Sequence, residues 1–152
     1  MDKYPQYSGM SFLPHETDYV IEESPAYTNI GGHVKTVEFV RNIDTKLWFF
    51  EAKFNKDFVG KFNERKREVY EKFLHSLSLY CAVRLGVMID KLPNSPELKG
   101  IVFALIINDC GPGDCRKIQE VLKTMLNPYL KIWKAEISVF NNNAAKQNHL
   151  IS

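Results

Sequence analysis

The strongest constraint on the fold is a short run that is apolar on both faces of a strand. Residues 47–50 read Leu-Trp-Phe-Phe. Successive side chains of a strand point to opposite faces, so Trp48 and Phe50 share one face while Leu47 and Phe49 share the other. A strand that is apolar on both faces is covered on both sides. The sequence therefore predicts a sheet with a packed layer on each face.

Three strands are predicted in the first third of the chain. Tyr19 to Glu22 forms the first strand, and Pro25 follows its end because proline cannot continue a strand ladder. His33 to Val40 and Leu47 to Phe54 form the second and third strands. The polar break from Arg41 to Lys46 can only be a hairpin loop between them.

The register of this hairpin decides where two carboxylates lie. If the loop is even and symmetric about the bond after Asp44, Glu38 lies directly opposite Glu51, and Thr36 lies opposite Lys53 on the same face. Directly opposed side chains have Cβ atoms about 5 Å apart. Two carboxylates this close repel unless one is protonated or a cation lies between them, which predicts a divalent-metal site. An odd loop would shift the register by one residue and move Glu38 to the other face.

The rest of the chain predicts alternating helices and strands. A helix covers 59–86, where apolar residues recur every three or four positions. The continuous apolar run 101–107 is a buried central strand, and 135–140 is an outer strand. Between them, a helix begins at Cys115 with Asp114 as its N-cap and continues to about Leu126, and Pro128 ends or kinks it.

This order predicts a single α/β (α+β) domain spanning 1–152. A mixed central sheet would contain a three-stranded meander, a helix crossover and helices on its faces. Residues 1–17 are expected to be a coil that covers the core, and residues 141–152 a polar, frayed tail.

Composition places the chain in a reducing compartment. The three cysteines are an odd number without a CxxC pair, and the first residues lack the apolar core of a secretory signal. The longest apolar run is far too short to cross a membrane. A cytoplasmic protein without membrane association is therefore expected. Because the net charge is only +2, any surface that binds nucleic acid must be local.

The sequence Phe-Phe-Glu51-Ala52-Lys53, with Glu38 on the preceding hairpin strand and a long helix after it, resembles the PD-(D/E)XK nuclease-like superfamily over about residues 18–107. The resemblance implies a restriction-endonuclease-like fold and hydrolysis of phosphodiester bonds in DNA or RNA. It also implies that magnesium or manganese is held by Glu38, Glu51 and the carbonyl of Ala52, and that Lys53 assists the attacking water.

Several further residues are weaker candidates for this site. Glu22 and Glu23 are candidate additional ligands, and Lys72 of the long helix is a candidate polar contribution to the site. The basic residues Lys61, Arg65 and Lys66 could meet phosphates, although helix faces with interspersed acidic residues are usually only solvated. Charged residues at a strand end can also pair with each other and do nothing more.

The sequence leaves a second function open. The family usually has aspartate, often after proline, where this chain has Val37-Glu38. A nuclease-like subunit that lacks catalysis and binds nucleic acid or a protein partner is therefore the alternative. The choice between DNA and RNA, a larger protein partner and a homodimer all stay open.

Overall fold

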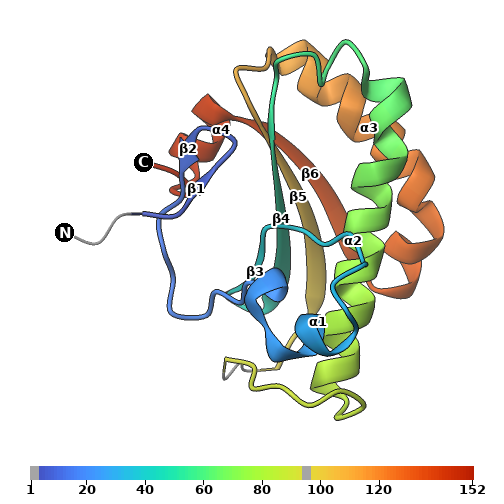
Figure 1. The fold of residues 1–152 in the computed structure, drawn as a ribbon. Coiled ribbons are helices and arrows are strands. Elements are labelled where there is room, and N and C mark those ends of the chain that lie inside the picture. Colours follow the sequence, from blue (N-terminus) through green and yellow to red (C-terminus); the bar gives the residue numbers. More distant parts are fainter. Residues whose placement is uncertain (1–3, 94–96) are drawn as a thin grey trace.

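The computed structural model describes residues 4–93 and 97–152. Its centre is a four-stranded mixed sheet with the strand order β3-β4-β5-β6 (Figure 1). The strands are β3 (Phe39–Ile43), β4 (Lys46–Phe54), β5 (Gly100–Asn108) and β6 (Ala135–Asn141). β3 is antiparallel to β4, whereas β4, β5 and β6 are mutually parallel. The predicted α+β class with a mixed sheet and crossover helices is confirmed.

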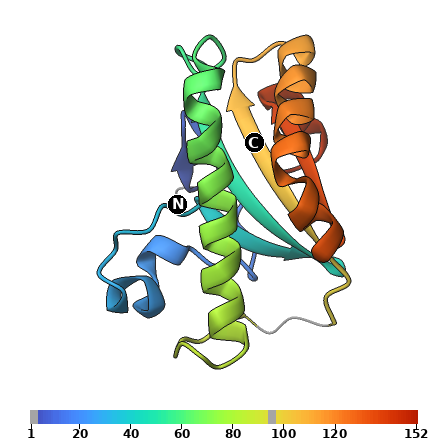
Figure 2. The same cartoon turned by 90° about the vertical axis from the view of Figure 1, so that its right-hand side faces the viewer.

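Two long helices cover one face of the sheet. They are α2 (Phe62–Arg84), between β4 and β5, and α3 (Pro112–Ile132), between β5 and β6 (Figures 1 and 2). The predicted apolar stripe of α2 is buried against the sheet, and it consists of Phe62, Val69, Phe73, Leu77 and Tyr80. Both helices connect parallel strands, so both run antiparallel to those strands and end where β5 and β6 begin.

The opposite face is covered by the two ends of the chain, which corrects two expectations. Residues 4–17 are not a simple coil, because β1 (Gln6–Tyr7) and β2 (Met10–Ser11) form a small hairpin there. The tail is not frayed either. It forms α4 (Asn142–Gln147), and Leu150 and Ile151 are buried beneath it. These apolar side chains complete the second core, which also contains Met10 and Phe12 of the N-terminal segment.

The predicted first strand is wrong, so the meander has two full strands and not three. Residues 21–23 form a short 3-10 helix, η1 (Ile21–Glu23), followed by α1 (Pro25–Asn29). Only Tyr19 pairs with the sheet, through two backbone hydrogen bonds to Val40 of β3. The chain then turns because the Ser24 side chain accepts a hydrogen bond from the Tyr27 amide and caps α1.

β3 begins at Phe39 instead of His33 and ends at Ile43, inside the predicted loop. The segment before it leaves the sheet and lies against α2. The Val37 amide donates a 2.8 Å hydrogen bond to the Ser76 hydroxyl, and both residues are buried. This side chain replaces the strand partner that Val37 would otherwise need.

The second crossover helix is longer than predicted at both ends. It begins at Pro112 with Gly111 as its N-cap, and Asp114 lies in the first turn instead of capping the helix. Pro128 lies inside the helix, which continues to Ile132. Pro112 suits the first position of the helix, because the amide donor that proline lacks has no partner there. Ile118, Leu122 and Leu126, which all lie within the predicted part of the helix, are buried in the core and hold α3 against the sheet.

The hairpin register is as predicted. β3 and β4 pair from Phe39–Phe50 to Ile43–Lys46, which leaves a two-residue turn at Asp44 and Thr45. Among the described helices, none has both the length and the apolar character that crossing a membrane requires.

Candidate functional site

Glu51 is a fully buried carboxylate in the middle of the sheet. It lies in β4, where its exposed side-chain fraction is 0%. The alternation along β4 places it on the same face as Leu47 and Phe49, which pack into the core under α2. A charged residue at such a position needs a partner, because an isolated buried charge is very costly.

Two lysines and a second glutamate surround this carboxylate. Lys72 Nζ of α2 lies 2.6 Å from Glu51 Oε2, and Lys53 Nζ of β4 lies 4.0 Å from the same oxygen. Glu68 Oε1 of α2 lies 3.2 Å from Lys53 Nζ and 3.8 Å from Lys72 Nζ. We call these four side chains the buried charge cluster. Both lysines keep some solvent contact, so the cluster opens to the surface through them.

Helix geometry explains why three polar side chains of α2 lie along the same side of the helix. Glu68, Lys72 and Ser76 are spaced by four residues, so they lie on one face of the helix. This face adjoins the apolar stripe and looks toward β4 and the segment before β3. The sequence identified Lys72 as a candidate, but it did not identify Glu68 or Ser76. Their spacing from Lys72 is the signal that could have found them.

Burial and neighbouring charges shift the pKa of Glu51 upward. Burial raises it most, the Lys72 ammonium partly opposes this effect, and the Glu38 carboxylate adds to it, which leaves a pKa of about 7. This carboxyl group can therefore exchange a proton near neutral pH. Such a pKa in a partly open cluster is typical of functional sites, although structural ion-pair networks also produce it.

The pKa values of Lys72 and Glu68 shift in the directions that favour their charged forms. Burial alone would lower the pKa of Lys72, but the nearby carboxylates of Glu51, Glu38 and Glu68 outweigh it, so this pKa is raised. Burial would raise the pKa of Glu68, but the ammonium groups of Lys53 and Lys72 outweigh it, and this pKa is lowered. The Lys72 side chain beside Glu51 is therefore favoured in its ammonium form.

Glu38 lies beside the cluster, but β3 begins one residue after it, at Phe39. Its amide donates a 2.9 Å hydrogen bond to the Phe50 carbonyl, although Phe50 already pairs with Phe39. Two successive residues thus face one residue of β4, which is a β-bulge. The predicted even register is correct, but the bulge replaces the direct Glu38–Glu51 opposition. The half-buried Glu38 carboxylate acts electrostatically on Glu51 and Lys72.

The predicted pairing of Thr36 with Lys53 is wrong for the same reason. Thr36 lies before the bulge, and its hydroxyl donates to the Glu22 carboxylate at 3.4 Å. Lys53 instead pairs with Glu68 within the cluster, and its Nζ lies 6.0 Å from the centre of the Phe58 ring.

The carbonyl of Ala52 points to the side of β4 on which β3 lies, at a level that β3 does not reach. Phe50 pairs with β3, and backbone groups two residues apart along a strand point the same way. β3 has no paired residue before Phe39, so the Ala52 carbonyl is directed past the first residue of that strand. The Ala52 amide lies 3.3 Å from the Glu51 carboxylate of the preceding residue.

The oxygens of Glu38, Glu51 and Ala52 are of the chemical type that magnesium takes as ligands. Glu38, Glu51 and the Ala52 carbonyl supply hard oxygen donors, and magnesium is often bound by only one or two carboxylates. Within residues 4–93 and 97–152, no group of three or more His, Cys, Asp or Glu side chains is placed to hold a metal ion. Glu22 and Glu23 are exposed, so they do not complete a carboxylate triad.

The candidate phosphate-binding residues lie on the first turns of α2. Lys61 precedes the helix as its N-cap residue, and Lys61 and Arg65 are exposed while Lys66 is half-buried. Arg65 lies one helical turn before Glu68, which brings this basic segment to the same end of α2 as the buried charge cluster.

Comparison with protein-family models, with curated proteins and with solved structures found no match for this chain. The chemistry of the described side chains is therefore the basis for proposing a function.

Proposed function

We propose that the chain is a metal-dependent nuclease of the PD-(D/E)XK type with a restriction-endonuclease-like core. The observation that carries the proposal is the fully buried Glu51 carboxylate, flanked by Lys53 on β4 and by Glu38 at the bulge. The order of β3, β4, α2 and β5, with β5 parallel to β4, supports the same core. Glu38, Glu51 and the Ala52 carbonyl would hold magnesium or manganese.

In this proposal, each residue has a defined task. A bound cation would polarise the phosphoryl oxygen and lower the pKa of a bound water. Lys53 lies on the solvent side of Glu51, where its ammonium can orient that water and balance negative charge developing on the phosphate. Lys61, Arg65 and Lys66 would contact the backbone of DNA or RNA, and their contribution would weaken as salt concentration rises.

Metal binding tests the first step directly. Titration calorimetry with manganese is expected to show binding to the native chain and at least tenfold weaker binding to Glu38→Gln and Glu51→Gln. Glu64→Gln is the matched control, because Glu64 is exposed on the first turn of α2. Unchanged binding in both site variants would overturn the assignment of the metal ligands.

Cleavage tests the function. Native protein is incubated with plasmid, single-stranded DNA and RNA in the presence of magnesium or manganese. Cleavage of at least one substrate is expected, and Lys53→Met should lower the rate by about 10²-fold, as expected for removal of one electrostatic group at a reacting centre. A native chain that is inert on all three substrates would contradict the proposal.

The second candidate is a nuclease-like subunit that binds without cleaving. One observation favours it: Lys72 Nζ already lies 2.6 Å from Glu51 and supplies an internal cation. A bound metal would have to share or displace this contact. Under this alternative, nucleic acid or a protein partner binds equally well with manganese or with EDTA, and Glu51→Gln leaves that binding unchanged.

A further inference from the structure

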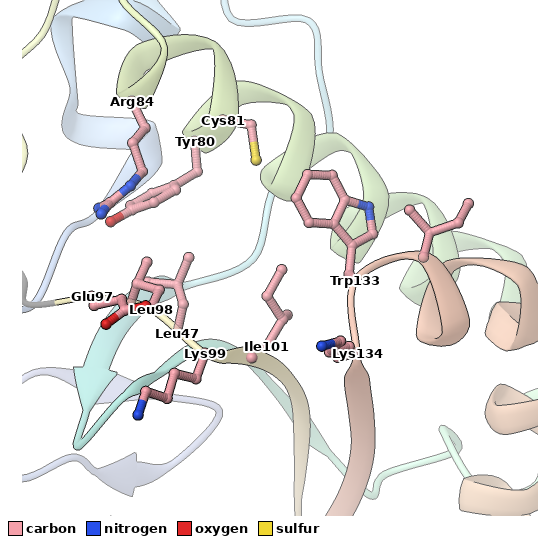
Figure 3. A pocket seen from close by; sticks show the side chains of 12 residues that line it. Leu47, Tyr80, Cys81, Arg84, Glu97, Leu98, Lys99, Ile101, Trp133 and Lys134 are labelled. Atoms are coloured by element: carbon pink, nitrogen blue, oxygen red, sulfur yellow. The ribbon is translucent and has the colours of Figure 1, made fainter.

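A pocket of about 650 Å³ opens at the other end of α2 from the Glu68 end (Figure 3). Its walls come from the C-terminal ends of α2 and α3 and from the start of β5. Arg84, which lines it, is the last residue of α2, whereas Lys72 is twelve positions earlier, or about 18 Å along a helix. The pocket is therefore separate from the buried charge cluster.

The inside of this pocket is mainly apolar. Leu47, Tyr80 and Ile101 belong to its lining and also to the main core. Trp133 stands at its wall, across from the Tyr80 and Arg84 side chains (Figure 3). The Trp133 side chain remains 40% exposed, although tryptophan is usually well buried in a folded domain.

The charges around the pocket are mostly positive. Arg84, Lys99 and Lys134 contribute three basic groups to its lining, and Glu97 contributes one acidic group. Next to the pocket, the Glu136 carboxylate is already paired with Lys46 at 2.8 Å. An occupant that brings carboxylates would therefore meet the two ammonium groups of Lys99 and Lys134 against the single carboxylate of Glu97.

Exposed apolar side chains gather at the same end of the molecule. Eight large apolar side chains are exposed in the described part of the chain, and five of them lie at or after the C-terminal ends of α2 and α3. They are Leu85, Val87, Ile89, Ile132 and Trp133. Concentrated apolar exposure with a charged rim is typical of a surface that binds another protein.

We propose that this end of the sheet docks a partner protein through an acidic amphipathic segment. Apolar side chains of the segment enter the pocket beside Trp133, and its carboxylates meet Lys99 and Lys134. A second copy of this chain fits poorly, because two such faces would bring like charges together. A nucleic acid fits poorly as well, because its phosphates gain nothing from the surrounding aliphatic side chains. This proposal does not depend on metal binding or cleavage.

The test selects peptides that bind the native chain and then measures their binding at the pocket through the fluorescence of Trp133. A phage library of random 16-residue peptides is selected on the native chain and counter-selected on the double variant Lys99→Glu/Lys134→Glu. Enriched peptides are expected to combine Leu, Ile, Phe or Trp with Asp or Glu. They are then titrated in a Trp48→Phe background, where Trp133 is the remaining tryptophan. Binding should shift the Trp133 emission to shorter wavelength.

The variants make the result specific. Lys99→Glu/Lys134→Glu is expected to bind the selected peptides at least tenfold more weakly, with an unchanged circular dichroism spectrum and melting temperature. Lys117→Glu/Lys123→Glu is the matched control, because it makes the same charge change at two exposed positions on α3. It should bind as the native chain does.

Four outcomes would overturn the proposal. No peptide is enriched over the counter-selection, or the enriched peptides are basic. The selected peptides bind both double variants equally. A single-stranded DNA oligonucleotide displaces the peptides and shifts Trp133 at lower concentration. Finally, the native chain alone shifts Trp133 with rising concentration, together with a dimer mass in ultracentrifugation.

Discussion

The Lys72 ammonium lies 2.6 Å from the fully buried Glu51 carboxylate, and the two residues come from different layers of the fold. α2 and β4 are therefore joined by charge as well as by apolar packing. In such a pair, removing one partner costs far more than removing both, because the remaining charge is left without compensation.

Lys72→Met is expected to lower the free energy of unfolding by about 3 kcal/mol at pH 8, where Glu51 is largely ionised. The double variant Lys72→Met/Glu51→Gln should recover most of this loss, since it leaves neither charge buried. Urea denaturation measures both changes. Lys66→Met, also on α2, is the control and should change the stability little. A double variant no more stable than Lys72→Met would contradict the pairing.

The raised pKa of Glu51 makes stability depend on pH in a defined direction. Its pKa is about 7 in the folded chain and 4.5 as the ordinary reference value. Between these values, the folded state keeps a proton that the unfolded chain has released, so rising pH lowers the free energy of unfolding. The stabilising contribution is present below pH 4.5 and is lost as pH rises through about 7.

Glu51→Gln removes this titration. The difference in unfolding free energy between Glu51→Gln and the native chain should therefore move in favour of the variant by about 3 kcal/mol from pH 4.5 to above pH 7. Urea denaturation at half-unit pH intervals measures the difference. A constant difference across this range would show that Glu51 titrates with an ordinary pKa.

Ser76→Ala should loosen the segment that enters β3. The Ser76 hydroxyl accepts the Val37 amide, and no backbone carbonyl takes that amide in a strand. Its loss leaves a buried donor without a partner and should cost about 1–2 kcal/mol. Ser78→Ala is the matched control, because Ser78 is exposed on the same helix.

Hydrogen exchange locates this effect. The Val37 amide is expected to exchange faster in Ser76→Ala. The exchange rates of the β5 amides should change only as much as the change in global unfolding free energy requires. Equal protection of Val37 in the native chain and in Ser76→Ala would rule out the proposed anchor.

The second face has its own buried cation, Arg41. Its guanidinium contacts the Asp18 carboxylate through two nitrogens, at 2.6 and 3.0 Å, and donates to the Leu13 carbonyl at 2.6 Å. The side chain is only 5% exposed. Arg41→Met should lower the free energy of unfolding by about 3 kcal/mol, because it leaves the Asp18 carboxylate without its partner.

Arg41→Lys should recover little of this loss, since an ammonium cannot reproduce the planar two-nitrogen contact. The control is Arg67→Met. Arg67 pairs with Glu71 on the exposed face of α2, and loss of such a surface pair should cost less than about 1 kcal/mol. Thermal or urea denaturation compares the three variants, and similar losses for Arg41→Met and Arg67→Met would contradict this ranking.

Much of the fold could be predicted because its signals are local and periodic. The alternation along 47–54 placed Glu51 and Lys53 on one face of the strand, and the even loop after Asp44 set the register of the hairpin. The apolar stripe of α2 and the continuous apolar run of β5 likewise identified buried elements correctly. In each case, the repeat of the apolar positions matches one secondary structure.

The errors lie where a distant segment supplies the missing partner. The sequence after Asn141 is mostly polar, but Leu150 and Ile151 pack against the apolar face of the sheet that α2 and α3 do not cover. The sequence predicted Arg41 to be a loop residue, but it lies in β3, where its guanidinium binds the Asp18 carboxylate and the Leu13 carbonyl. Local patterns contain no information about such contacts, which form between residues far apart in the chain.

The sequence by itself determined which residues carry charge into the sheet, because strand alternation makes Glu51 and Lys53 neighbours on one face. Only the tertiary structure decided what surrounds them. The Ser76 hydroxyl accepts the Val37 amide, Glu38 lies at the bulge next to it, and the packing of α2 brings Lys72 against Glu51. A buried charge must be compensated at short range, and only the packed fold can bring its partner there.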